Sequence, residues 1–446
     1  MKVSVIGTGY VGLVSGVCLA EKGHKVVCVD VDQDKVDQNN KGVPTVHEKG
    51  LEELLKKNLR ANFSASTNLA RTVYETDMTL IAVGTPYDGR EIDLAYIKTA
   101  SAQIGRALRD KDSYHVVVVK STVVPGTTDN FVGPILESAS GKRAGIDFGL
   151  VMNPEFLREG EAILDFMNPD RIVMGGVDSR SIAALDQLYE VFPGADKIRT
   201  SNKVAEMIKY ASNSLLATLI SFSNEIGNLC AAVGDVDVVD VLNGVCLDKR
   251  LCPITASGER IVPPITTYLQ AGCGFGGSCF PKDVKALIAY GNTVGRPMQM
   301  LKSVIELNEQ QHNEILLLLR KHYPDFRGLH VAVLGLAFKP GTDDIRESPA
   351  IPIINKLLGE GAIIKAFDPV ACDAARNIWA ESEEIAYCQE LSVALEGVEA
   401  ILLLTRWEEF QKLPELLGRL KNTPLLIDGR RMLDKSRFTR YEGIGL

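Results

Sequence analysis

The N-terminal residues place a glycine fingerprint between two short apolar segments. Residues 3–6 predict a buried strand, residues 10–22 a helix, and residues 25–30 a second strand. The loop that opens the helix is Gly7-Thr8-Gly9-Tyr10-Val11-Gly12, which fits G-x-G-x-x-G. A fingerprint in this position predicts a right-handed strand–helix–strand unit, and with it a doubly wound α/β fold.

The same loop predicts a dinucleotide site. In order, its three glycines permit a tight turn, a close approach of the backbone to a pyrophosphate, and close packing of the helix on the strand. The helix N-terminus, at Tyr10 and Val11, then meets the phosphate charge. Asp30 ends the second strand 23 positions after Gly7, where an acid can bind ribose hydroxyls and repel a 2′-phosphate. NAD is therefore favoured over NADP. Lys35 is either a solvated helix residue or a further ribose contact.

The rest of the chain alternates between apolar and helical segments. Up to about residue 200 the predicted strands are 78–83, 115–120 and 148–152, and the predicted helices are 50–59 and 92–108. Residues 201–230 contain no proline and predict one helix of ~45 Å that joins two lobes and offers a dimer interface. After a linker at 323–328, the predicted strands are 329–334, 363–368, 400–404 and 424–428. We therefore expect two Rossmann-like doubly wound domains joined by a long central helix, with parts at 1–200, 201–315 and 316–446.

The composition argues against several classes of protein. The 446 residues include 49 Lys and Arg against 57 Asp and Glu, a net charge of −8, so the basic surplus of a nucleic-acid binder is missing. No apolar run approaches the ~20 residues of a membrane span, and glycines interrupt the apolar N-terminus, which argues against a signal peptide. Nine cysteines without disulfide spacing favour a reducing, cytoplasmic setting.

The most informative segment surrounds one cysteine. Cys279 follows a loop with glycines at 274, 276 and 277 and precedes Pro281, a residue typical of a first helical turn. A helix N-terminus and the neighbouring Lys282 both favour a thiolate, and the glycines leave room for a substrate. Asp283, one turn on, is either a base or a helix cap. Cysteines elsewhere, such as Cys18, fit buried apolar patterns, and the gaps of 5, 20 and 5 residues within 246–279 do not suit a zinc site.

Other candidate residues occur in pairs. Lys209 and Asn213 share a face of the long helix and could stabilise an oxyanion, although a lysine that snorkels to solvent is the alternative. Glu155 and Glu159 have the same i,i+4 spacing, for which a solvated helix face is the alternative. Two loops at the predicted carboxyl edge of the sheet contain Thr85 and Thr122, which are either ligand contacts or turn residues.

A nicotinamide cofactor combined with a nucleophilic cysteine predicts a four-electron oxidation. A thiol can capture an aldehyde as a thiohemiacetal, which loses a second hydride to give a thioester, and water then releases the acid. A one-step NAD dehydrogenase of the 3-hydroxyacid type would not need the thiol. A nucleotide-sensing module that has lost catalysis is a third possibility.

The chain resembles the UDP-glucose/GDP-mannose dehydrogenase family over almost its whole length. The motifs that carry the resemblance are GTGYVG (7–12), VGTP (83–86), STVVPGTT (121–128), NPEFLREG (153–160), MNPDRIVMG (167–175), KVAEMIKYASN (203–213), GFGGSCFPKD (274–283) and FKPGTDDIRESP (338–349). The resemblance implies an NAD-binding domain, a central dimerisation domain that carries the cysteine loop, and a C-terminal domain that binds a UDP-sugar. MNPDRIVMG and FKPG are more similar to the UDP-glucose branch, and Ser278 differs from the Gly-Gly-His-Cys pattern typical of the N-acetylhexosamine branch. GDP-mannose or another nucleotide hexose remains an alternative substrate.

The resemblance, together with the fingerprint, also implies roles for individual residues. The expected catalytic residues are Cys279 as nucleophile, Lys209, Asn213 and Asp283 for protons and oxyanion charge, and Thr122 and Glu155 for a catalytic water. The expected cofactor contacts are Gly7, Gly9, Tyr10, Val11, Gly12, Asp30, Lys35, Thr85, Thr122, Glu159, Lys282 and Arg346. The expected substrate contacts are Glu155, Phe156, Leu157, Glu159, Lys209, Asn213, Arg250, Tyr268, Gly274, Gly276, Phe338, Lys339 and Arg430. No metal site is expected.

One segment departs from the family pattern. In the family, a short segment links the arginine motif at Arg250 to the glycine loop. Compared with that pattern, residues 252–266 resemble an insertion between the two motifs. In similar enzymes that arginine reaches the sugar site of a neighbouring subunit, so the insertion leaves this role of Arg250 open. Cys273, directly before Gly274, is also unusual.

Overall fold

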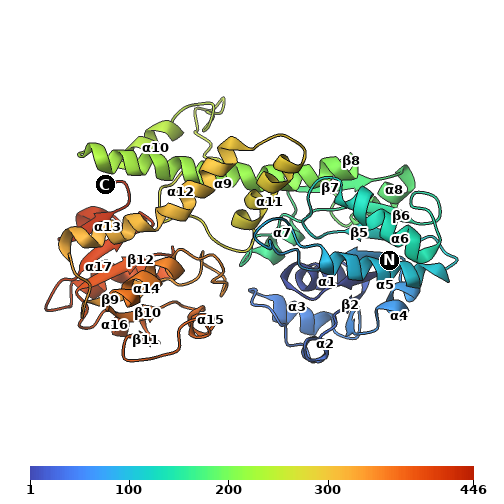
Figure 1. The fold of residues 1–446 in the computed structure, drawn as a ribbon, viewed down its shortest axis with the longest axis horizontal. Helices are drawn as coiled ribbons and strands as arrows, with labels where there is room; N and C mark the ends of the chain where they lie inside the picture. The colour runs from blue at the N-terminus through green and yellow to red at the C-terminus, as the bar shows by residue number, and fades with distance from the viewer. The chain divides into compact units, whose positions relative to one another are not determined.

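A computed structural model describes residues 1–446 and divides the chain into two compact units, Met1–Ser212 and Asn213–Leu446. The boundary falls inside one continuous helix, α9 (Asn202–Val233), drawn in green in Figure 1. The long helix predicted over residues 201–230 is therefore confirmed, and it extends three residues further.

The first unit contains a sheet of eight strands. In chain order these are β1 (Lys2–Ile6), β2 (Lys25–Val29), β3 (Phe63–Ser66), β4 (Met78–Ile81), β5 (Val116–Val119), β6 (Gly149–Met152), β7 (Arg171–Gly176) and β8 (Asp196–Thr200). In space they follow the order β3-β2-β1-β4-β5-β6-β7-β8. The predicted parallel arrangement is confirmed from β3 to β6.

The last two strands differ from the prediction. β7 is antiparallel to β6, with Val151 opposite Gly176, and β8 is parallel to β7. An additional parallel strand would need a connection that crosses back over the sheet. Segment 153–170 instead stays at the edge of the sheet where β6 ends, so β7 starts there and runs in the opposite direction to β6. A wholly parallel sheet is therefore wrong at this edge.

Helices cover both faces of this sheet. One core contains alternate strand residues such as Val5 and Leu80, and the other contains their neighbours Ile6 and Ile81. On the first face lie α1 (Tyr10–Glu21), α3 (Leu51–Asn58), α7 (Ala162–Met167) and α8 (Ser179–Leu188), and on the second α4 (Leu69–Glu75), α5 (Ala95–Arg109) and α6 (Gly133–Ser140). Two remaining elements are α2 (Gln33–Asn40) and η1 (Thr128–Val132). Strands buried on both faces explain why their sequences are continuously apolar.

The second unit begins with helices and ends with a second sheet. Its helices before the sheet are α10 (Val238–Cys246), the 3-10 helix η2 (Pro264–Tyr268), α11 (Phe280–Thr293), α12 (Gln299–Gln311) and α13 (Asn313–His322). The strands are β9 (His330–Leu334), β10 (Ile363–Phe367), β11 (Ile385–Tyr387), β12 (Ala400–Leu403), β13 (Leu425–Asp428) and β14 (Tyr441–Gly443). All pairings are parallel, in the order β11-β10-β9-β12-β13-β14.

This order repeats that of β3-β2-β1-β4-β5-β6, so the second sheet is doubly wound like the first. Its helices are α14 (Ala350–Gly359), α15 (Cys372–Arg376), α16 (Leu391–Ala394), η3 (Glu408–Lys412), α17 (Leu413–Leu417) and η4 (Lys435–Arg437). The four predicted strands are confirmed. β11 and β14 were not predicted, because three residues are too few for a periodic pattern.

The helix α9 is long and apolar enough to cross a membrane by length and composition alone. Its buried polar side chains nevertheless bond to loops within each unit: Glu206 accepts from Thr128, and Asn224 accepts from Gly272. Such contacts are typical of a helix in the core of a folded domain, so we do not interpret α9 as a membrane span.

Candidate active site

The glycine loop after β1 has the geometry that the fingerprint predicts. Gly7 adopts φ +99°, and its N–H donates to the Val29 carbonyl at 2.7 Å, which makes the tight turn. A Cβ on Gly12 would lie 1.9 Å from the Gly7 oxygen, whereas a Cβ on Gly9 would meet nothing within 4 Å. The loop is therefore closed on its sheet side and open above Gly9, where a pyrophosphate would approach.

The start of α1 offers unsatisfied donors at the same place. Gly9 is the N-cap of α1 and provides no side-chain cap, so the N–H groups of Tyr10 and Val11 remain available to an anion. Asp30 follows β2 and accepts from the Thr8 N–H at 2.8 Å, the Thr8 hydroxyl at 2.5 Å and the Asp32 N–H at 3.1 Å. A carboxylate has about four acceptor positions, so one stays available for a ribose hydroxyl.

The charge of Asp30 is maintained by its partners. Burial raises its pKa, but the hydrogen bonds from Thr8 and the nearby Lys35 hold that pKa below the usual range. Lys35 lies in the first turn of α2, half-buried, and its N–H bonds to the capping Asp32. The loop, the helix end and the acid together fit a bound dinucleotide.

The loops after β4 and β5 meet one another. The Thr85 hydroxyl donates to the Thr122 carbonyl at 2.8 Å, and the Ser121 hydroxyl donates to the Val83 carbonyl at 2.6 Å. Glu206 of α9 fixes the second loop, because its carboxylate accepts from the N–H groups of Gly126 and Thr128 at 2.5 and 2.8 Å. Glu206 is fully buried, and burial raises its pKa to about 7.

A buried charged cluster lies between the loop after β6 and α9. The Lys209 ammonium bonds to Glu155 at 3.0 Å, and both side chains are less than 10% exposed, so Lys209 does not snorkel to solvent. Burial raises the pKa of Glu155, but the Lys209 charge holds it below the usual range. Lys120, which was not singled out from the sequence, is also buried here and bonds to Asn153 at 3.1 Å. Burial lowers the pKa of Lys120 to about 8, so this lysine can give up or take up a proton close to neutral pH.

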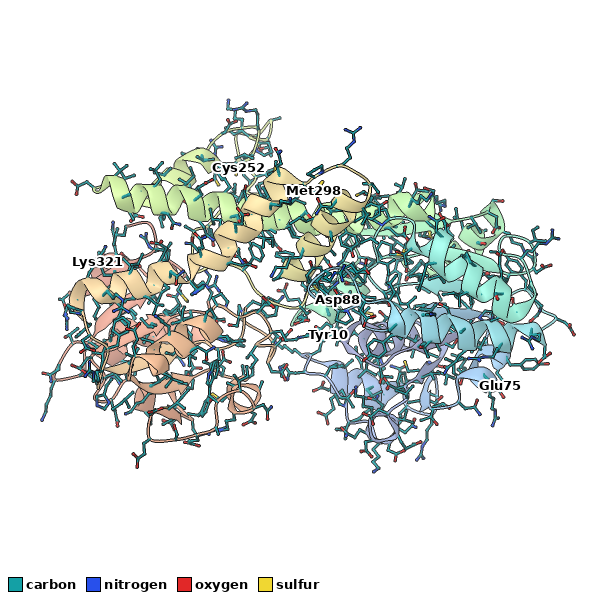
Figure 2. All side chains as sticks on the ribbon, viewed as in Figure 1. Tyr10, Glu75, Asp88, Cys252, Met298 and Lys321 are labelled. Carbon is teal, nitrogen blue, oxygen red and sulfur yellow. The ribbon has the colours of Figure 1, made fainter.

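Segment 153–160 is a loop, so the alternative of a solvated helix face for Glu155 and Glu159 is wrong. Its backbone is pinned by Glu48, which accepts from the N–H groups of Gly160 at 2.7 Å and Ala162 at 2.9 Å. The Tyr10 hydroxyl also donates to Glu48 (Tyr10 is labelled in Figure 2). One buried carboxylate therefore connects the dinucleotide loop to the loop predicted to bind substrate.

The other residues of this loop are only partly buried. Phe156 stacks with two cations, Arg171 at 3.9 Å and Lys209 at 5.4 Å from its ring centre. Leu157 donates its N–H to Glu155 at 2.6 Å, which helps to orient that carboxylate. Both Phe156 and Leu157 retain exposed surface that a ligand could contact.

In the second unit, Cys279 is the N-cap residue of α11, with Pro281 in the first turn, as predicted. The Ser278 hydroxyl lies 3.7 Å from the Cys279 sulfur. Asp283 is 1% exposed and does not cap the helix: its carboxylate accepts from Asn213 at 2.6 Å and from Lys282 at 2.6 Å. A half-buried thiol at a helix N-terminus is favoured as thiolate.

The glycine loop before Cys279 is held by side-chain amides. Asn308 of α12 bonds to both the N–H and the carbonyl of Phe275, at 2.8 and 2.9 Å. Gln311 donates to the Gly272 carbonyl at 2.9 Å. A Cβ on Gly276 would lie 2.1 Å from the Glu347 oxygen, so glycine is required by close packing there. Cys273 is fully buried in this packing.

The second sheet brings its predicted ligand residues against this loop. A Cβ on Gly277 would lie 2.6 Å from the Phe338 ring, and the Lys339 ammonium lies 5.8 Å from the centre of that ring. Arg430 donates to the Gly274 carbonyl at 2.9 Å. The Arg346 guanidinium bonds to Asp344 at 2.7 Å and is largely exposed.

Two further predicted contacts lie in the segment before the loop. The Tyr268 ring packs 6.4 Å from the Phe280 ring, next to Cys279. Arg250 is 90% exposed and bonds to Asp248 at 2.5 Å within the same turn. Within 252–266, which begins at the Cys252 labelled in Figure 2, Ile254 and Arg260 form a short antiparallel bridge.

The loop after β9 repeats part of the loop after β1. Gly335 adopts φ +95° and donates its N–H to the Phe367 carbonyl at 2.8 Å, as Gly7 does to Val29. Asp368 follows β10 as Asp30 follows β2, but Asp368 is 4% exposed and accepts five N–H groups. Its acceptor positions are therefore occupied by the chain itself.

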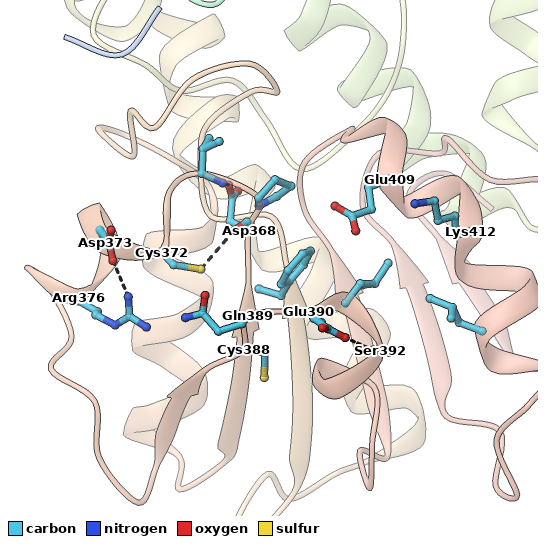
Figure 3. Close-up of a pocket in the computed structure, with 15 residues that line it drawn as sticks. Asp368, Cys372, Asp373, Arg376, Cys388, Gln389, Glu390, Ser392, Glu409 and Lys412 are labelled. Carbon is cyan, nitrogen blue, oxygen red and sulfur yellow. Dashed lines mark hydrogen bonds and ion pairs between the residues drawn. The ribbon is translucent and has the colours of Figure 1, made fainter. Parts of the chain in front are cut away.

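A cavity of about 500 Å³ opens beside Asp368, between the segments that follow β10, β11 and β12 (Figure 3). Its size suits a small ligand. However, Asp373 and Arg376 in its wall bond to one another at 2.6 Å, and Glu390 accepts from Ser392. None of the predicted substrate residues lines it.

Comparison with protein families accounts for nearly the whole chain. Residues 1–193 match the NAD-binding domain of the UDP-glucose/GDP-mannose dehydrogenase family, residues 203–310 its central domain, and residues 332–435 its UDP-binding domain. The chain belongs to this family. It is accordingly an NAD-dependent enzyme that acts on a nucleotide sugar, and the predicted cofactor is confirmed.

Individual relatives support the same assignment. This dehydrogenase is 41% identical to a UDP-glucose 6-dehydrogenase of Haloferax volcanii, with all of both chains covered. It is 43% identical to a GDP-mannose 6-dehydrogenase of Pseudomonas syringae over 82% of its own length and 81% of that protein. A UDP-glucose dehydrogenase structure from Pyrobaculum islandicum superposes with a TM-score of 0.89 at 39% identity, covering 100% of this chain and 97% of that one.

Several residues of this dehydrogenase site were not singled out from the sequence. Lys120, Glu48, Glu206, Asn308 and Gln311 are polar residues within or beside apolar segments. A buried polar residue must find partners, so such positions could have been marked as anchors. Their partners lie up to 114 positions away, and only the folded chain identifies them.

Proposed function

We propose that this dehydrogenase oxidises UDP-glucose to UDP-glucuronate in two steps at Cys279. The observation that carries the proposal is the thiol itself: Cys279 is the N-cap of α11, on a glycine loop, one turn before the buried Asp283. A one-step alcohol oxidation has no use for a thiol in this position, whereas an aldehyde-to-acid oxidation can proceed through a covalent adduct on it.

The chemistry assigns a role to each group. NAD, held by the glycine loop at Gly7–Gly12 and by Asp30, would supply the hydride acceptor for both oxidations. In the first, the C6 alcohol gives up a hydride from carbon and a proton from oxygen and becomes an aldehyde. The Cys279 thiolate then adds to the aldehyde carbon, and the resulting oxyanion is stabilised by Lys209 and Asn213. Asp283, held by Asn213 and Lys282, takes up and returns protons.

The second oxidation converts this thiohemiacetal into a thioester. A water held by Thr122 and Glu155 attacks the thioester carbon, the carbon–sulfur bond breaks, and the acid leaves with Cys279 restored. Each turnover therefore consumes one water and two NAD and yields one carboxylate and two NADH. Glu155 is suited to hold water because its charge is maintained by Lys209.

Two observations support UDP-glucose as the sugar nucleotide. The match to curated UDP-glucose 6-dehydrogenases covers 96 to 100% of this chain, against 82% for the curated GDP-mannose enzymes. Structures of N-acetylhexosamine dehydrogenases are only 25 to 26% identical. The GDP-mannose enzymes reach 43% identity where they match, so GDP-mannose is the second candidate.

A stoichiometric assay tests both the mechanism and the sugar. The protein is mixed with excess NAD and with UDP-glucose or GDP-mannose in turn, and NADH and sugar acid are measured. We expect two NADH per acid with UDP-glucose. One NADH with an accumulating aldehyde would contradict the thioester route. Turnover of GDP-mannose but not of UDP-glucose would identify GDP-mannose as the substrate. Absence of turnover with any nucleotide hexose would favour a binding module.

The Cys279→Ser variant separates the two steps. We expect it to bind NAD as the natural protein does and to form no acid. Full acid production by this variant would remove Cys279 from the mechanism.

We also propose that the enzyme is a homodimer or a higher oligomer of the cytoplasm. On α9, Leu215, Phe222 and Leu229 are 53, 46 and 60% exposed, and their spacing of seven residues places them on one face. A second copy would cover this face, which light scattering tests. No disulfide joins any of the nine cysteines, which suits a reducing compartment.

A further inference from the structure

Three consecutive side chains after β12 each reach a different part of the second sheet's carboxyl edge. The Thr405 hydroxyl donates to the Ala337 carbonyl at 2.6 Å. The Arg406 guanidinium donates from Nε to the Arg430 carbonyl at 3.0 Å, and Nη2 bonds to the same oxygen. The Trp407 indole donates to Asp368 at 3.0 Å. Residues 405–407 therefore connect the ends of β9, β10 and β13.

The contact of Trp407 also acts on the β9 loop. The Asp368 oxygen that accepts the indole N–H also accepts the backbone N–H groups of Leu336 and Ala337, at 2.8 and 3.1 Å. Phe338 and Lys339 follow directly in the chain. Removal of the indole donor would free this oxygen to shift, and the loop that carries Phe338 and Lys339 would lose one of its fixed ends.

Both loops tied by residues 405–407 rest against the loop of Cys279. On one side, the Gly277 N–H donates to the Arg346 carbonyl at 2.9 Å. On the other, Arg430 donates to the Gly274 carbonyl at 2.9 Å, and the Cys273 N–H donates to the Gly429 carbonyl at 3.0 Å. The position of the thiol loop is therefore set by the β9 loop and the β13 loop together.

We propose that Thr405, Arg406 and Trp407 are positioning residues, which fix the two substrate loops and, through them, the loop of Cys279. This inference rests on the proposed function, because it takes Phe338, Lys339 and Arg430 as substrate contacts. Residues 405–407 act through backbone carbonyls and Asp368, since their hydrogen bonds go to these groups. Arg406 is mostly buried beside Arg430, and its pKa is lowered to about 10 by burial, so it remains a cation at neutral pH.

The chain offers a matched control. Trp379 is the other of its two tryptophans, and its indole N–H donates to Asn355 at 2.8 Å, away from the three loops. Trp407→Phe and Trp379→Phe therefore remove the same indole donor from the same unit, in one case from the carboxyl of Asp368 and in the other from the amide oxygen of Asn355. Thr405→Val is a second variant, which removes a donor with almost no change in volume.

The test compares these variants in two measurements. With UDP-glucose and NAD, Trp407→Phe should raise the KM for the nucleotide sugar about tenfold, the typical effect of losing a hydrogen bond to a charged group, and leave the KM for NAD unchanged. Without any substrate, the rate at which iodoacetamide alkylates Cys279, followed by peptide mass analysis, should change about threefold or more. Trp379→Phe should match the natural protein in both.

The outcomes distinguish this inference from the proposed function. If Trp407→Phe and Thr405→Val both match Trp379→Phe in alkylation rate, or raise the KM for NAD as much as that for the sugar, the positioning role is refuted. If the alkylation rate changes but UDP-glucose is not a substrate, the positioning role stands and the proposed substrate fails. If Trp407→Phe does not fold, the same two measurements on Thr405→Val decide.

Discussion

Replacement of Lys209 by methionine tests how much the buried ion pair with Glu155 contributes to the stability of the fold. The two groups lie 3.0 Å apart and are 4 and 7% exposed, so the variant leaves a carboxylate in a site without solvent. Removing one partner of such a pair costs about 3–5 kcal/mol. The Leu157 N–H and the nearby Lys120 still oppose part of the charge, which places the expected loss near 3 kcal/mol.

The effect should depend on pH in a defined direction. In the natural protein Lys209 holds the pKa of Glu155 below its usual range, so the pair stabilises the fold at neutral pH and loses this effect only as pH falls through that low pKa. Without Lys209, burial dominates and the pKa of Glu155 rises, so Glu155 becomes neutral in mild acid. The destabilisation should therefore be largest near pH 8 and shrink toward pH 5.

Thermal unfolding at these two pH values measures the effect. A loss of about 3 kcal/mol corresponds to a fall of about 6–12 °C in the Tm of a unit of this size. Lys203→Met, an exposed lysine on the same helix, is the control and should change the Tm little. The double variant Lys209→Met with Glu155→Gln should recover most of the loss. An equal fall at both pH values, or no recovery in the double variant, would refute the reasoning.

Three further predictions concern the loops. Because burial raises the pKa of Glu206 to about 7, the fold binds its proton more tightly than the unfolded chain does, so stability should fall as pH rises toward 7, and Glu206→Gln should flatten this dependence in thermal melts. Gly9→Ala should leave the Tm unchanged, since its Cβ meets nothing within 4 Å, but weaken NAD binding measured by calorimetry about tenfold or more. Gly276→Ala, whose Cβ would lie 2.1 Å from the Glu347 oxygen, should lower the Tm or kcat, whereas Gly244→Ala, whose Cβ meets nothing within 4 Å, should change neither. Equal Tm and equal kcat for the two variants would contradict the packing argument.

Much of the fold follows from local patterns. Apolar runs of four or five residues between helices predict β1, β4, β5 and β9, because strands buried on both faces need continuous apolar sequence. The direction of β7 does not follow, since it depends on where segment 153–170 is held, which is a tertiary property. The strands β11 and β14 have three residues each, which is too short to show a periodic pattern of apolar residues.

The candidate site divides in the same way. Gly7, Gly12 and Asp30 could be assigned from sequence because each is required by local backbone geometry next to a strand end. Glu48 and Lys120 could not, because their importance comes from burial and from donors that are distant in the chain. Local signals therefore identify the cofactor loop, and only the folded chain identifies the groups that hold the loops in place.

The two related sheets differ in one property that decides how many dinucleotides a chain can take. Asp30 has three donors, so a ribose hydroxyl can still complete its coordination. Asp368 has five donors, one of which is the indole of Trp407, so the chain itself occupies the acceptor positions that a ribose hydroxyl would need. The second sheet is thereby closed to NAD, and a titration of the protein with NAD should count one molecule per chain.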